Sequence, residues 1–271
     1  MTLIIAQQAE PLTATDLAIS AALVVIAGLV SVCLRLKLER QLAIASVRTV
    51  VQLLLIGYIL REVFALDQFW AIAIVATLMI IAASRAAVTR PSRSFRGATY
   101  AAFVTLIITG MLTTYSVTGV VIGVEPWYKP QYMIPLLGMV LGNGLTGISL
   151  CLDHLLESLS ERRHIVEMEL AHGATAWEAA REPVTDAVRR GMIPIINSMM
   201  VVGIVSLPGM MTGQILSGED PLRAVKYQIV VMFMICAATS LGSIGVALLV
   251  YLRLFNHRHQ LRSEMIEKRE K

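Results

Sequence analysis

The chain has 271 residues, of which 56% are hydrophobic and 15% charged, and its mean hydropathy is +0.70. Soluble domains carry about 25% charged residues, so this chain has too little polar surface to cover a water-soluble globule. The composition excludes intrinsic disorder and a disulfide scaffold, and the formal net charge of +4 argues against a nucleic-acid partner. The sequence therefore predicts an integral membrane protein.

Seven stretches are long and apolar enough to cross a bilayer core of about 30 Å as helices. They cover residues 17–34, 41–60, 68–84, 97–124, 130–152, 191–218 and 227–252. The fourth and sixth have 28 residues each and contain Gly or Pro, so each is predicted to be one tilted, kinked or partly broken span. The expected fold class is an all-α integral membrane protein with seven transmembrane helices in a single domain, residues 1–271.

Lysine and arginine are distributed unevenly between the connecting segments. Eighteen of the 23 lie in residues 35–40, 85–96, 162–190 and 253–271. Because basic residues are retained in the cytoplasm, this pattern predicts the N-terminus outside and the C-terminus inside. Trp70, Trp127 and Tyr128 then fall at the outer boundary, where amphipathic rings prefer to lie.

Residues 153–190 form the longest segment between spans on the predicted cytoplasmic side. Leucines at a helical period predict that the fifth span continues as an amphipathic helix to about His172. Gly173 is suited to end that helix, and Thr175 followed by Glu178 makes a capping box for a second one. The apolar stripe of the second helix could pack on the chain's own spans or dock a partner. That stripe is Trp177, Ala180, Val184 and Val188.

Residues 169–175 read ELAHGAT, a glutamate followed by small residues and a glycine between two short helices. This string resembles the cytoplasmic EAA-type loop of ABC transporter permeases, which couples to the ATP-hydrolysing subunit. The resemblance implies that residues 153–190 are a coupling region. The residues assigned to it are Glu169, Ala171, Gly173, Ala174, Thr175, Trp177 and Glu178.

Residues 203–213 read GIVSLPGMMTG, and DP at 220–221 and AVKYQ at 224–228 follow. These motifs resemble the signature of FetB-type permeases, a family of iron or metal exporters that includes the plant aluminium-tolerance permeases. The resemblance implies the membrane half of an ABC exporter in the bacterial inner membrane. It also implies a homodimer of permeases bound to two cytoplasmic ATPase subunits, and iron or another metal ion as cargo.

The sequence lacks the phosphate-binding pattern GxxxxGK[ST], so ATP and Mg²⁺ are expected on the separate ATPase subunit and no cofactor on this chain. It also lacks HExxH and GxSxG, and the spans hold no aspartate pair. The chain is therefore predicted to be a non-catalytic permease subunit. A seven-span receptor without an ATPase is the lower-ranked alternative; a retinal protein is excluded because the last span has no lysine.

Candidate residues for the translocation pathway fall in two groups. Arg48, the only charged residue inside a span, shares a helix face with Gln52, although snorkelling toward headgroups would also explain its position. Proline and glycine near residue 208 favour a break that exposes backbone carbonyls, although they could also simply bend a packed helix. The full set is Arg48, Gln52, Asn143, Asn197, Met199, Met200, Ser206, Pro208, Gly209, Met210 and Met211.

The side chains available to a metal ion do not match iron well. Methionine thioethers favour soft ions, whereas iron prefers carboxylate or imidazole ligands, and no span contains Asp, Glu or His. The cargo could therefore be a metal chelate, or a polar organic solute such as a nucleotide sugar. His257 and His259 form an HxH pair in the basic tail, for which a headgroup-facing role is the simpler interpretation.

Overall fold

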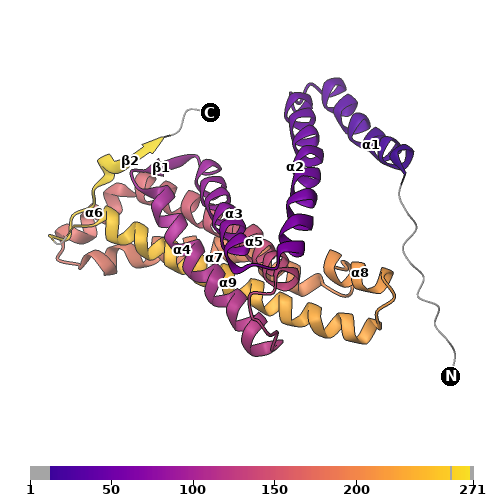
Figure 1. Cartoon of the computed structure of the whole chain (residues 1–271). Coiled ribbons are helices and arrows are strands. Elements are labelled where there is room, and N and C mark those ends of the chain that lie inside the picture. Colours follow the sequence, from indigo (N-terminus) through magenta and orange to yellow (C-terminus); the bar gives the residue numbers. More distant parts are fainter. Residues whose placement is uncertain (1–12, 257, 269–271) are drawn as a thin grey trace.

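The protein is a helical bundle with two helices that stand away from it (Figure 1). The computed structural model describes residues 13–256 and 258–268. The long helices are α1 (Ala14–Cys33), α2 (Glu39–Leu66), α3 (Phe69–Thr89), α4 (Ala98–Tyr115), α5 (Pro130–Glu161), α7 (Ala176–Val201) and α9 (Pro221–Leu254). The shorter elements are α6 (Arg163–Ala171), α8 (Gly209–Leu216), the π-helical η1 (Ser116–Val121), the 3₁₀-helical η2 (Ser263–Met265), β1 (Arg93–Phe95) and β2 (Ile266–Lys268).

Among the described residues, six helices are long and apolar enough to cross a membrane: α1, α2, α3, α4 with η1, α5 and α9. The two long apolar runs behave differently. Residues 97–124 form one helix that ends in the π-helical turn η1, so this run is continuous. Residues 191–218 do not form one helix, because α7 ends at Val201 and α8 begins at Gly209. The multi-span helical class is confirmed, and six of the seven expected spans are single helices.

Helix α5 lies at the centre of the bundle and packs against α3, α4, α7 and α9. Small residues allow the closest of these approaches. A Cβ atom on Gly191 of α7 would lie 2.8 Å from the Gly147 carbonyl oxygen of α5 and 2.6 Å from Ser243 Oγ of α9. Three helices therefore meet at one point where only hydrogen fits.

The two ends of the bundle have different structures. The α6 end, as we call it, contains the turn 90–97, α6, the start of α7 and residues 256 and 258–268 of the tail. There β1 pairs with β2 antiparallel, with Ser94 opposite Glu267. The α8 end contains α8 and the starts of α3, α5 and α9. At this end the Phe69 ring lies 5.7 Å from that of Trp70, 6.5 Å from Trp127 and 5.4 Å from Tyr128. The three aromatic residues predicted to share a boundary therefore do share one end of the bundle.

Candidate coupling unit and translocation pathway

The helix, glycine turn and helix predicted in residues 153–190 are present, with one difference. Helix α5 ends at Glu161, and Arg162 leaves the helical conformation before α6 begins, so the amphipathic helix is split rather than continuous. This turn changes the chain's direction, and Val166 on α6 is buried. Helix α6 ends at Ala171, next to the predicted His172.

Gly173 has φ +94°, a left-handed conformation that glycine adopts without strain. Its N–H donates to the Leu170 carbonyl at 3.1 Å, and the Ala174 N–H donates to the Glu169 carbonyl at 3.1 Å. These two bonds close the end of α6. The role predicted for this glycine as a helix stop is confirmed.

The capping box at the start of α7 is also present. Glu178 N–H donates to Thr175 Oγ1 at 3.3 Å, while Thr175 N–H and Oγ1 both donate to Glu178 Oε2 at 2.7 Å. These hydrogen bonds to the carboxylate lower the pKa of Glu178 below its usual value. The exposed start of α7 is therefore rigidly capped at neutral pH.

A second cap comes from the C-terminal tail. The Ala176 N–H donates to His259 Nδ1 at 2.9 Å, and this contact holds the tail against α7. His259 thus contacts the start of α7, within the segment predicted to be a coupling region. Its sequence neighbour in the HxH pair, His257, lies outside the described residues.

The apolar stripe of α7 packs mainly on the chain itself. Ala180 and Val184 are buried, and the Trp177 ring lies 5.3 Å from that of Tyr251 on α9. What faces outward around the glycine turn is polar: Glu178, Arg181 and Glu182 are exposed. Of the residues assigned to coupling, Ala171, Gly173, Thr175, Trp177 and Glu178 are exposed, and Glu169 and Ala174 are partly exposed.

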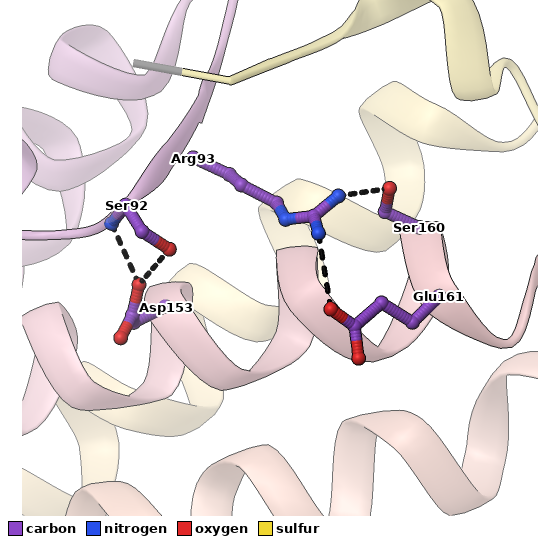
Figure 2. A network of polar contacts seen from close by, with 5 residues as sticks. All are labelled: Ser92, Arg93, Asp153, Ser160 and Glu161. Atoms are coloured by element: carbon purple, nitrogen blue, oxygen red, sulfur yellow. Dashed lines mark hydrogen bonds and ion pairs between the residues drawn. The ribbon is translucent and has the colours of Figure 1, made fainter. Parts of the chain in front are cut away.

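Polar contacts fix the turn between α3 and α4 to the adjoining end of α5 (Figure 2). Asp153 Oδ1 accepts from the Ser92 N–H at 2.7 Å and from Ser92 Oγ at 2.9 Å. Arg93 forms an ion pair with Glu161 at 3.1 Å and also donates to Ser160. Asp153 thus helps to hold the α6 end together.

The predicted break lies between α7 and α8. Gly203 has φ +84°, and its N–H donates to the Ser206 carbonyl at 2.9 Å, which closes a tight turn. Pro208 then precedes the first residue of α8. Ile204 and Val205 in the turn are 88% and 79% exposed, so the break presents an apolar tip rather than a closed core segment.

The pathway candidates do not form one site. Met199 and Met210 pack against a single buried cluster together with Met139, Met192 and Met232. Asn197, Met200, Ser206 and Gly209 are exposed around the break, Pro208 is partly exposed and Met211 is buried. The Asn143 amide donates to the Met139 carbonyl at 2.9 Å on an exposed face of α5. Arg48 and Gln52 lie apart from all of these on α2.

Pattern analysis missed a pocket of about 300 Å³ at the α8 end, because its lining comes from three helices and the turn after α8. The lining includes Tyr132, Met210, Gln214, Glu219, Arg223 and Tyr227. Glu219 forms an ion pair with Arg223 at 3.4 Å, and Gln214 Oε1 is buried without a hydrogen-bond partner in the described structure. The motifs GIVSLPGMMTG and AVKYQ contain Met210 and Tyr227 but do not indicate that these two residues line one pocket.

Within residues 13–256 and 258–268, no three His, Cys, Asp or Glu side chains lie together so that they could hold a metal ion. The methionine cluster offers thioethers, which suit soft ions and also fill irregular packing. The described structure thus contains no preformed site with hard ligands for iron.

Comparison with known proteins relates most of the chain to one protein family. The model of the "Uncharacterised protein family (UPF0014)" matches residues 14–255. The "UPF0014 membrane protein slr1647" of Synechocystis is 40% identical over 229 residues, 83% of this chain and 87% of the relative. The Escherichia coli protein named "Probable iron export permease protein FetB" is 32% identical over 258 residues, 95% and 98% of the two chains.

A plant relative extends the comparison. The Arabidopsis thaliana protein named "ALUMINUM SENSITIVE 3" is 32% identical over 248 residues, 91% of this chain and 89% of the relative. No solved structure matches.

Proposed function

The chain belongs to the UPF0014 family of membrane proteins, and on that premise we propose that it is the membrane-spanning permease subunit of an ATP-driven exporter. The observation that carries the proposal is the capped, glycine-hinged unit α6–α7 at one end of the bundle. A permease that hydrolyses no ATP needs such a rigid element, through which a separate ATPase can act.

We infer seven crossings, the seventh made by α7 and α8 together. The pairing of β1 with β2 places the turn between α3 and α4 on the same side as the tail, and the Ser92–Asp153 contact places that turn beside the end of α5. Helix α9 crosses the membrane once, from the α8 end to the side of the tail. The chain that leads from α6, on the tail side, to the start of α9 must therefore also cross once. The basic residues at the α6 end favour a cytoplasmic location for it.

Helix α7 provides the mechanical link. It runs from the capping box at Thr175 to the break after Val201 without interruption, a length of about 39 Å for 26 residues. Closure of two ATPase subunits against the α6 end would move this helix as a unit and so displace the break and α8. Each nucleotide state would thereby favour a different arrangement of the spans.

The cargo we propose is iron or another metal ion, following the name of the Escherichia coli relative. The absence of hard metal ligands that lie together within the described residues favours transport as a complex rather than as a bare ion. Two permeases and two ATPases form the working unit in the bacterial inner membrane. A receptor that acts without an ATPase is the competing function.

Co-purification with an ATPase and stimulation of its activity test the proposal. Gly173→Val places a β-branched residue at φ +94°, and Glu169→Lys reverses a partly exposed charge at the turn. We expect both variants to reach the membrane but to lose at least about fivefold in cargo-stimulated ATPase activity. Glu125→Lys, a charge reversal at an exposed position near the opposite, α8 end, is the matched control. Normal stimulation in both variants would exclude the coupling role, and failure to bind any ATPase would favour the receptor.

A further inference from the structure

Three long polar side chains share one face of α2. Gln41, Arg48 and Gln52 are separated by seven and four residues, which places them within about 40° of one another around a helix. All three side chains are exposed, and none of them forms a hydrogen bond or ion pair with another described residue. In contrast, the hydroxyls of Ser46 and Thr49 donate to backbone carbonyls of their own helix at 2.7 and 2.8 Å.

The rest of the chain does not cover this face. Helix α1 lies on the other side of α2, across an apolar groove of about 860 Å³ whose lining includes Leu42, Ser46 and Leu53 but none of the three polar residues. The bundle contacts α2 only near its end, where Val63 is buried and Phe64 packs on the core. In Figure 1 most of α2 stands clear of the bundle formed by α3 to α9.

Lipid does not provide hydrogen-bond partners for this whole face of α2 either. Gln52 lies twelve residues beyond Arg40, or about 18 Å along the helix, which is close to the middle of a hydrocarbon core. Arg48 is about 12 Å from the same end and could reach headgroups by snorkelling. The shorter amide of Gln52 cannot do so. Polar side chains at this depth face protein or water.

The face has the spacing of a helix–helix seam. The positions alternate by four and three residues, as in a left-handed helix pair. They are Gln41, Ala45, Arg48, Gln52, Leu55, Ile59 and Glu62, and all are exposed. Two copies in one membrane have the same orientation, so a two-fold axis along the membrane normal brings each position level with itself. Gln52 then meets Gln52, and an amide can both donate to and accept from its copy.

The same symmetry brings two Arg48 side chains to one depth. The apolar stretches of all seven predicted spans contain no Asp, Glu or His, so no side chain of the chain lies at that depth to neutralise them. Two guanidinium groups repel each other strongly in a low dielectric. An anionic solute that enters between the copies would balance this charge.

We propose that this seam of α2 is the contact between two copies of the chain, and that the paired Arg48 groups at the contact bind an anionic cargo. The assignment of the anion as cargo rests on the proposed permease function, whereas the contact between the two copies does not depend on it. It assigns metal export to anionic complexes such as an iron chelate, which need no metal ligand from the protein.

Cysteine cross-linking in native membranes tests the contact without any ATPase. In a Cys33→Ser background, Leu55→Cys and Ile59→Cys lie on the seam, whereas Leu54→Cys lines the groove facing α1 and is the matched control. We expect covalent dimers from the two seam variants at a yield at least tenfold above that of the control. Equal yields, or no dimer from seam cysteines that a maleimide labels, would overturn the proposal.

Anion binding is tested on the purified full-length chain in nanodiscs, with radiolabelled citrate and iron(III) citrate as probes. Arg48→Gln is expected to weaken binding at least tenfold, and Arg48→Lys to keep it within about threefold. Both variants should retain the Leu55→Cys cross-link, which shows that they are folded and paired. Unchanged binding in Arg48→Gln, or binding of free Fe²⁺ but of neither anion by the wild type, would overturn the anionic assignment. Loss of ATPase stimulation alone would count against the proposed permease function. It would leave the cross-linking and anion-binding results unchanged.

Discussion

Thr175 and Glu178 determine how firmly α7 begins, because their side chains satisfy backbone N–H groups that no helical carbonyl reaches. Thr175→Ala removes the hydroxyl that accepts from the Glu178 N–H and is expected to cost about 1 kcal/mol locally. Hydrogen exchange of peptides that cover residues 175–180 should then become about fivefold faster. Thr175→Ser retains the hydroxyl and should exchange like the wild type; equal exchange in all three proteins would show that tertiary packing alone fixes this end.

Local chemistry explains why these residues were predictable from the sequence. A glycine after an amphipathic stretch and a Thr-x-x-Glu string act over four residues, so Gly173 and the capping box could be read directly. The second cap could not be predicted in this way, because His259 is 83 residues from Ala176 in the chain. The headgroup-facing role of the basic tail stays a prediction.

Helix α7 crosses α5 and α9 at a point that tolerates no side chain on Gly191. Gly191→Ala would place Cβ 2.8 Å from a backbone oxygen, so the helices must separate, and we expect a loss of about 2 kcal/mol and a fall in Tm of about 5 °C in detergent. Gly142→Ala is the matched control, since its Cβ would meet no atom within 4 Å and alanine favours a helix. A similar Tm for both variants would contradict the tight crossing.

At the level of elements, the sequence predicted most helices, but it did not predict that the second helix of residues 153–190 continues into the apolar run that begins at 191. Proline and glycine near residue 208 correctly indicated a break. However, Arg189 and Arg190 marked a membrane boundary and so suggested that a span begins at 191, whereas α7 continues through them from residue 176. Two internal prolines, Pro183 and Pro194, do not interrupt it. Continuity of a helix across a membrane boundary has no signature in hydropathy.

At the scale of the whole molecule, the C-terminal tail holds the α6 end together through contacts remote in sequence. A chain truncated after Asn256 loses both the β1–β2 pairing and the His259 cap on α7. We expect the truncated permease to insert normally, because no span is removed, but to show protease cleavage between residues 162 and 176 at least fivefold faster. Arg258→Ala leaves both contacts in place and serves as the control. Equal cleavage rates would mean that α6 and α7 hold their arrangement without the tail.

The number of crossings decides whether the coupling unit can meet an ATPase at all. In a Cys33→Ser background, Ser217→Cys lies at the α8 end, and Arg181→Cys and Arg258→Cys lie at the α6 end; all three positions are exposed. If α7 and α8 cross together, an impermeant maleimide applied to intact spheroplasts should label Ser217→Cys at least tenfold faster than the other two. Permeabilised membranes should label all three alike. Labelling of Ser217→Cys and Arg181→Cys from the same side would mean that α7 and α8 enter and leave the membrane on one side. A single crossing by α9 would then carry β2 to the side opposite β1, which is incompatible with the pairing of these two strands. Labelling of Arg181→Cys from outside would place the coupling unit beyond reach of ATP.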